Sequence, residues 1–356
     1  MEVLVLDTNF IAVDIVDSFD SLIWADRYSK VGDFEIYTGV NLHMLAVLKK
    51  KYYLLLAGSD HAMIIEGRGL TTNPEEGNHI VFSGRSLESI LDRRIIWNQT
   101  ILSGNFQDGI EQLLNENAIS PTIPERIIPN LRFVPSTDPA VTALTIDAQF
   151  TGDNLLNVIE KLCAEKNIGW KIILTEDNHF DFMLYSGVDR SYSQTANPYV
   201  IFSPKFDNIL NSNYAESNKE EKTISLVAGE GEGAARKTTT VEVESGGGSG
   251  LDRREMFTDA RDISSNVDGG TLPEADYNAQ LAQRGKEDLA DNVAITSFEG
   301  QVDTTILYKY GTDFFMGDIL QIANEYDMET KARVVEFIHS QDLNGEARYP
   351  TFAEVE

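Results

Sequence analysis

Hydrophobic and polar positions alternate in short runs over the first hundred residues, and this period predicts strands. In GDFEIYTG, Phe34 and Ile36 fall on one face while Glu35 and Tyr37 fall on the other. The stretch 52–84 reads as strand, turn, strand, loop and strand, with turn-forming residues between the apolar runs. The first part of the chain is therefore expected to be rich in strands.

Two segments in this part have a helical period instead. NLHMLAVLK predicts a short helix whose apolar face is formed by Leu42, Leu45 and Leu48. RSLESILDRR predicts a second helix, in which Leu87 and Leu91 belong to one apolar stripe.

The middle of the chain has a different hydrophobic pattern, with helical periods in place of most of the strand alternation. Residues 107–119 and 152–169 predict helices, and Cys163 falls on the buried face of the second one. The segment 170–187 predicts a hairpin with apolar side chains on one face of both strands. From Pro198 the strand pattern returns, except for a glycine-rich loop at 246–250 and a helix at about 273–291.

The sequence LDRR occurs twice, at 91–94 and 251–254, but the first copy ends a predicted helix and the second lies in an extended stretch. We interpret that repeat as accidental. A longer similarity relates 62–66 (AMIIE) to 332–336 (ARVVE), each followed by a loop with Asn and Gly and a second strand. Each also follows a strand that begins with Gly-Asp, at Asp33 and Asp318. This similarity predicts two related β-barrels.

We therefore predict an α+β, mostly β fold with two related β-barrel domains and a small α+β insertion. The first barrel, with short helices, is expected at 1–105, and the inserted α+β domain at 106–197. A strand-rich connecting region and the second barrel, with the helix at about 273–291, are expected at 198–356.

Charge and composition exclude several classes of function and structure. The chain has 57 acidic against 29 basic residues, a net charge of -28, which excludes binding to nucleic acid by neutralising phosphates. Solubility explains this charge, and so does a surface that DNA can pass without adhering; composition leaves both open. Cys163 is the single cysteine, so no intrachain disulfide is expected. No apolar run is long enough to predict a membrane span, and the N-terminus predicts a first strand rather than a signal peptide.

No arrangement of residues predicts catalysis. The five histidines are scattered; His61 and His79 fall on strands expected to pair, but no third metal ligand is evident. The glycine-rich segment GEGEG at 229–233 lacks the Lys-Ser/Thr of a phosphate loop, and its acids would repel phosphate. We therefore predict no enzyme activity, no catalytic residues, no metal and no cofactor.

Several blocks together resemble a known family. They are FEIYTG, SGRSLESILDRRIIWNQT, GDNLLNVIEKLCAEKNIGWKI, FSPKFDNILNSNY, LVAGEGEG, LDRREMFTDARDISS and YKYGTDFFMGDILQIANEY, in this order from about residue 22 to 352. The chain resembles a tail-protein family (gene-product-37-like) of long-tailed, non-contractile phages and their prophages. That family is similar in turn to the baseplate hub proteins of contractile tails and to the N-terminal part of tail-associated lysins. The chain departs from the family at TTTVEVESGGGSG.

The resemblance implies a structural virion component at the tail tip, made in the cytoplasm of the bacterial host. Hubs of this kind are trimers with two related barrels per chain, so three chains give a pseudo-six-fold ring. Such a ring joins the six-fold tail tube to a three-fold tip and surrounds the DNA channel. The implied partners are further copies of the chain, a distal tail protein, a tape-measure protein and a tip fibre or lysin. Phage DNA would pass without specific binding, and no membrane insertion is implied.

The resemblance also makes several residues candidates for contacts between subunits or domains. They are Arg93, Arg94, Trp97, Arg253, Arg254 and Asp318. For each arginine, an ordinary solvated or locally paired side chain is an equally good interpretation. For Trp97, a place in the core is favoured over the interface.

Two other functions remain as alternatives. A tail-associated cell-wall hydrolase would carry its catalytic domain after the second barrel, and because this chain ends at Glu356 we expect none. A carbohydrate-binding module for host recognition would need exposed aromatic side chains along a groove, for example Trp97, Tyr308 and Tyr310.

Overall fold

The computed structural model describes residues 1–73, 77–267, 270–302, 307–326 and 329–355. Its largest element is a single hydrogen-bonded sheet built from both ends of the chain. Its strands in chain order are β1 (Val3–Leu6), β2 (Ala12–Val16), β3 (Ser21–Arg27), β4 (Asp33–Gly39), β5 (Tyr53–Leu56), β6 (Ala62–Asn73), β7 (Gly77–Ser86), β13 (Ile201–Phe202), β14 (Ile209–Ser217), β20 (Ile295–Val302), β21 (Ile319–Ala323), β22 (Glu329–Asp342) and β23 (Gly345–Glu354).

The two ends of the chain contribute the same arrangement of strands. The first contributes the order β3-β4-β7-β6-β5 and the second the order β14-β20-β23-β22-β21, with antiparallel pairing throughout both series. The long hairpins β6–β7 and β22–β23 correspond, and the pairing register shifts near Glu66 in one and near Val335 in the other. The similarity between 62–66 and 332–336 therefore reflects equivalent strands. The Gly-Asp part of that comparison is wrong, since β4 corresponds to β20, and β21 to β5.

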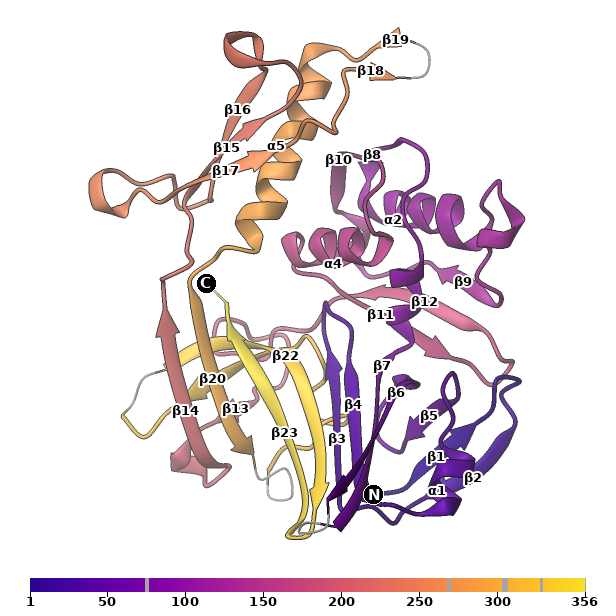
Figure 1. Ribbon diagram of the computed structural model, residues 1–356. Coiled ribbons are helices and arrows are strands. Elements are labelled where there is room, and N and C mark those ends of the chain that lie inside the picture. The colour runs from indigo at the N-terminus through magenta and orange to yellow at the C-terminus, as the bar shows by residue number, and fades with distance from the viewer. Residues whose placement is uncertain (74–76, 268–269, 303–306, 327–328, 356) are drawn as a thin grey trace.

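The two series are joined where β3, the edge strand of the first, pairs with the part of the long strand β22 that lies beyond its pairing with β21. Strand β3 pairs with β22 in antiparallel register, so that Trp24 lies opposite His339. The guanidinium of Arg27 lies at this pairing and contacts Glu336 and Asp33, both at 2.7 Å. This β3–β22 pairing, which we call the seam, joins segments about 300 residues apart in sequence into one continuous sheet, which we call the wall (Figure 1).

The middle segment forms a layer of helices and short strands above the first half of the wall (Figure 1). Its elements are β8 (Thr100–Asn105), α2 (Phe106–Leu114), a π-helical turn (Asn115–Ile119), β9 (Leu131–Val134), α3 (Pro139–Thr142), β10 (Thr145–Phe150), α4 (Leu155–Glu165), β11 (Gly169–Leu174) and β12 (Phe180–Tyr185). Cys163 is buried on α4 and the strands β11 and β12 form the predicted hairpin. Ala62 and Ile64 of β6 extend the same core, so this layer is packed onto the wall.

A second unit projects beside the middle layer. It consists of β15 (Ile224–Ala228), β16 (Thr238–Glu242), β17 (Glu255–Asp259), the short hairpin β18 (Asn266–Val267) and β19 (Gly270–Thr271), and helix α5 (Glu274–Ala290). The helix covers one face of the three-stranded sheet and buries Tyr277 and Leu281. Its other side meets the middle layer, where Gln280 accepts a hydrogen bond from Gln149 and Asp288 lies 3.3 Å from Lys161. The helical period predicted α5, but no local pattern indicated that it packs with β15, β16 and β17 as one unit.

The predicted α+β, mostly β class is confirmed, but details of two helices differ. In α1 (Leu42–Val47) the buried side chains are Met44 and Val47, with Leu48 just after the helix, whereas Leu42 is exposed. The predicted leucine face was therefore wrong at Leu42, whereas Leu48 is buried and Leu45 packs against the core, as predicted. The segment Leu87–Arg93 is a 3₁₀ helix, and the second LDRR overlaps a short 3₁₀ turn, Gly250–Asp252.

Candidate functional site

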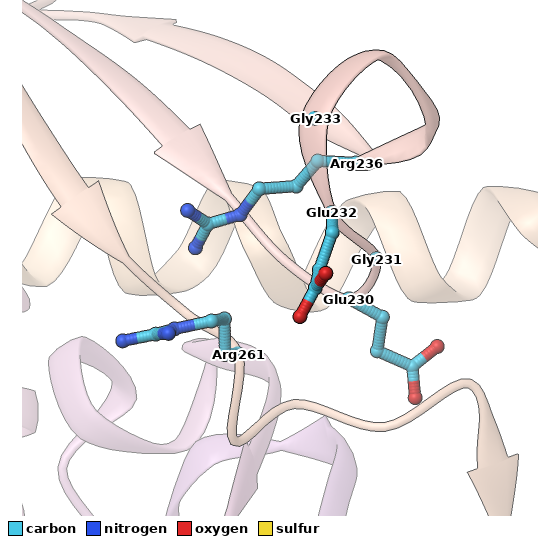
Figure 2. A pocket seen from close by; sticks show the side chains of 6 residues that line it. All are labelled: Glu230, Gly231, Glu232, Gly233, Arg236 and Arg261. Carbon is cyan, nitrogen blue, oxygen red and sulfur yellow. The ribbon is translucent and has the colours of Figure 1, made fainter.

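A hollow of about 410 Å³ lies beside the glycine-rich segment 229–233 (Figure 2). The carboxylate of Glu230 accepts hydrogen bonds from Ser264 and Ser265, and the guanidinium groups of Arg236 and Arg261 bind Asp259. Figure 2 shows the two guanidinium groups extending to one side and the Glu230 carboxylate to the other. These side chains brace the loop against its neighbours and do not converge on a common point.

A buried charged pair lies where the middle layer meets the wall. The Nδ1 atom of His61, just before β6, is 2.9 Å from Oε1 of Glu88, and both side chains are almost fully buried. The same carboxylate oxygen accepts a hydrogen bond from the backbone N–H of Ile172 in β11 at 2.9 Å. Glu88 therefore connects β6, the 3₁₀ helix and the middle layer.

The electrostatics of this pair follow from its surroundings. Burial alone would lower the pKa of His61, but the charges of Glu88 and Asp26 outweigh it and raise that pKa to about 9. Burial opposes the charged form of Glu88, yet His61 and its hydrogen bonds hold the pKa of that carboxyl below its usual value. His61 is thus a buried, charged structural residue. His79 instead stacks on Tyr37 at 5.0 Å, so the two histidines do not form a metal site together.

Asp318 is buried, and its carboxylate holds two segments of the chain together. Its carboxylate lies 2.7 Å from Nε of Arg190 and accepts the backbone N–H groups of Val188 and Phe315. The neighbouring backbones approach so closely that a Cβ added at Gly187 would lie 1.8 Å from the carbonyl oxygen of Gly317. Asp318 therefore fastens the segment after β12 to the start of β21. In this chain by itself, Asp318 offers no exposed surface.

Arg94 and Trp97 lie in one surface cluster together with Arg126. The Nε group of Arg94 donates to the carbonyl oxygen of Arg126 at 2.6 Å, and the Arg126 guanidinium lies 5.0 Å from the centre of the Trp97 ring. Trp97 is 55% exposed, so the expectation that it belongs to the core was wrong. We call this surface the arginine–tryptophan patch; it comprises Arg93, Arg94, Ile95, Trp97, Arg126 and Ile127.

The second pair of predicted arginines lies elsewhere. Arg253 forms an exposed ion pair with Glu255 at 2.6 Å. Arg254 lies 3.5 Å from Glu221 and also donates to the carbonyl oxygen of Asn218. Both act locally within the projecting unit and its connection to β14. The structure does not bring them to the arginine–tryptophan patch.

The aromatic residues of the carbohydrate-binding alternative do not line one groove. The ring of Tyr310 stacks on Phe337 with centroids 3.7 Å apart, and Tyr308 packs edge-on against Phe202. These tyrosines thus pack against the core of the second half of the wall, whereas Trp97 lies in the patch.

The residues that the structure describes contain no metal-binding cluster and no membrane-spanning helix. Within those parts of the chain, no group of three or more His, Cys, Asp and Glu side chains could hold a metal ion. No helix among them is both long and apolar enough to span a bilayer.

Sequence reasoning missed three residues that these sites depend on. Glu88 sits inside an apolar stripe, beside Leu87, and that position was the available signal for a buried carboxylate. Arg126 ends a short 3₁₀ helix, Pro124–Arg126, in a segment with no periodic pattern, so nothing local marked it. Arg190 lies 128 residues from Asp318, and only the fold brings the two together.

Three solved structures with a similar fold are tail proteins. Tail protein gp18 of a prophage of Listeria monocytogenes EGD-e matches with a TM-score of 0.55 and 13% identity, over 99% of this chain and 94% of that one. The tail protein of Neisseria meningitidis MC58 matches with a TM-score of 0.57 and 12% identity, over 99% and 96%. The 43 kDa tail protein of prophage MuSo2 from Shewanella oneidensis matches with a TM-score of 0.56 and 11% identity, over 100% and 98%. The fold is thus that of phage tail proteins.

The family is defined by sequence. The model of the Siphovirus ReqiPepy6 Gp37-like proteins matches residues 2–352, and the chain belongs to this siphovirus tail-protein family. No curated protein sequence matches it. The predicted family is therefore confirmed, and the chain is placed among the virion components of phage tails.

Proposed function

We propose that this protein is the hub at the distal end of the phage tail. Three copies form a ring that joins the six-fold tail tube to a three-fold tip and surrounds the DNA channel. In this role the protein is structural and catalyses no reaction. Its partners are further copies of itself, the distal tail protein, the tape-measure protein and a tip fibre or lysin.

The repeated strand order carries this proposal. Each chain contains two series of five strands with the same order and the same antiparallel pairing, joined through β3 and β22. A ring of three chains would therefore present six similar units, three of each kind. That number matches a six-fold tube, while the differences between the two kinds leave three-fold symmetry for the tip.

The net charge of -28 suits a ring around DNA. A negatively charged lumen repels phosphate, so the genome can pass without adhering to the wall. An electropositive lumen in a structure of the assembled ring would contradict this part of the proposal.

The mass of the purified protein in solution tests the ring. We expect light scattering after gel filtration to give three times the chain mass of 39.7 kDa. Negative-stain images of that peak should show a ring with a central hole. Release of sugars from cell walls by the purified protein would instead favour a hydrolase.

Location in the particle provides a second, independent test. Gold-labelled antibody against the protein should bind phage particles at the distal tip of the tail. Labelling along the tube, or its absence from purified virions, would overturn the hub proposal whatever the mass in solution.

A further inference from the structure

The arginine–tryptophan patch concentrates positive charge on a strongly acidic protein. Arg93, Arg94 and Arg126 lie together, and within the described residues no carboxylate comes within ion-pair distance of any of the three. Burial lowers the pKa of Arg94, and the charges of Arg126 and Arg93 lower it further. Burial also lowers the pKa of Arg126. Most other arginines of this chain have acidic partners, among them Arg27, Arg85, Arg132 and Arg190.

Two of the three guanidinium groups of the patch, those of Arg94 and Arg126, are held in place mainly by backbone carbonyls. Besides its bond to Arg126, Arg94 donates to the carbonyl oxygen of Arg93 at 2.8 Å. Arg126 donates from Nη2 to the carbonyl oxygen of Ile95 at 2.6 Å and to Oδ1 of the buried Asn117 at 3.3 Å. A guanidinium has five N–H groups, so several remain available on each arginine. Because these two side chains are already ordered, they lose little further conformational entropy when a partner binds.

The patch also exposes apolar surface around the arginines. Trp97 is 55% exposed, Ile95 42% and Ile127 41%. Tryptophan and arginine are the residue types that most often dominate the binding energy of protein interfaces. An aromatic ring with preordered arginines on one side fits a partner that offers carboxylates beside an apolar contact.

We propose that the arginine–tryptophan patch is one side of the contact between neighbouring copies of this chain, and that it binds an acidic surface on the next copy. Charge complementarity favours a second copy, since 57 acidic residues against 29 basic ones make much of this chain's own surface acidic. In a cyclic ring each contact joins two different surfaces, so a basic patch can meet an acidic one at every junction. The inference rests on the proposed function, because ring assembly brings the second copy to this surface.

Sedimentation of three variants against the wild type tests this contact. Trp97→Ala removes the aromatic anchor but leaves its backbone N–H bond to Asn117, and we expect the dissociation constant of self-association to rise about 30-fold. Arg93→Glu changes an exposed side chain for which no hydrogen bond or ion pair is described. We expect a rise of about 10-fold at low salt that shrinks at high salt. The matched control is Arg68→Glu, at another exposed arginine that has no ion pair with any residue that the structure describes, and we expect a change of at most about twofold.

The possible outcomes distinguish a failure of the patch contact from a failure of the hub proposal. Weakened association in the two patch variants, with unchanged circular dichroism and an unaffected control, supports the contact. Equal association of all four proteins overturns it and leaves the ring intact. A wild-type protein that stays monomeric up to about 100 µM overturns the contact as well. In that case, antibody labelling of the tail tip decides the hub proposal separately.

Discussion

Replacing Glu88 by glutamine should weaken the fold in a pH-dependent way. The substitution keeps the size of the side chain and an oxygen that can accept the N–H of Ile172. It removes the negative charge that lies 2.9 Å from Nδ1 of His61 in the junction between the wall and the middle layer. The imidazole would then lose its principal reason for being charged.

The magnitude follows from the pKa of His61. A rise from 6.5 to about 9 corresponds to about 3 kcal/mol of unfolding free energy. Because the pKa in the folded state is raised, this stabilisation is complete below pH 6.5 and is lost as the pH rises through about 9. The lowered pKa of Glu88 reports the same interaction from the other side, so it adds nothing further.

Urea titration at pH 6 and pH 9.5, followed by tryptophan fluorescence, measures the effect. Trp170 in β11 is two residues from Ile172 and reports on this junction. We expect Glu88→Gln to lose about 3 kcal/mol at pH 6 and far less at pH 9.5. The control is Asp60→Asn. The Asp60 side chain is 74% exposed and its carboxylate lies 2.8 Å from Nζ of Lys171, so its loss should cost under about 1 kcal/mol.

Two results would refute this reasoning. A loss of equal size at both pH values would show that packing or the hydrogen bond to Ile172, and not charge, is responsible. A loss below about 1 kcal/mol at pH 6 would show that the buried pair is not ionised.

Three further predictions concern other buried groups. Burial raises the pKa of Glu287 to about 7, which destabilises the fold as the pH rises from 4.5 through 7. Glu287→Gln should therefore raise the unfolding free energy in urea by up to about 3 kcal/mol at pH 8 and leave it unchanged at pH 4. Asp318→Ala leaves the partly buried guanidinium of Arg190 without its carboxylate partner and should cost about 3 kcal/mol in the same assay. Its comparison variant, Arg253→Ala, breaks an exposed pair and should cost under about 1 kcal/mol, so equal losses would count against this role of Asp318. Burial raises the pKa of the Cys163 thiol far above its usual value, so a thiol reagent at pH 8 should modify it only after unfolding; rapid reaction of the folded protein would contradict this.

The local pattern of hydrophobic residues was sufficient to predict several elements of the structure. The apolar period of 152–169 predicted α4 with Cys163 buried, and the alternation in 170–187 predicted the β11–β12 hairpin. The similarity between 62–66 and 332–336 located two equivalent hairpins. These predictions succeeded because the period of a helix or strand is set by nearby residues, and a buried face keeps that period.

The candidate contact residues were only partly predictable. Arg94 and Trp97 do lie together on the surface, but their neighbour Arg126 is 32 residues from Arg94 in sequence and came from an unpatterned turn. Asp318 was expected at a contact, and its partner Arg190 had no local signal. A sequence shows which residues can carry charge, whereas pairing depends on which distant backbone arrives within hydrogen-bond distance.

The sequence by itself determined the mostly β class, the acidic character, the family and the positions of most periodic elements. Only the tertiary structure decided the β3–β22 seam, the packing of the projecting unit on the middle layer, and the exposed side of α1. It also decided that His61 and Glu88 are a buried ion pair and that Trp97 is exposed. The physical reason is that burial and partner choice depend on contacts between distant segments, which the local hydrophobic period does not encode.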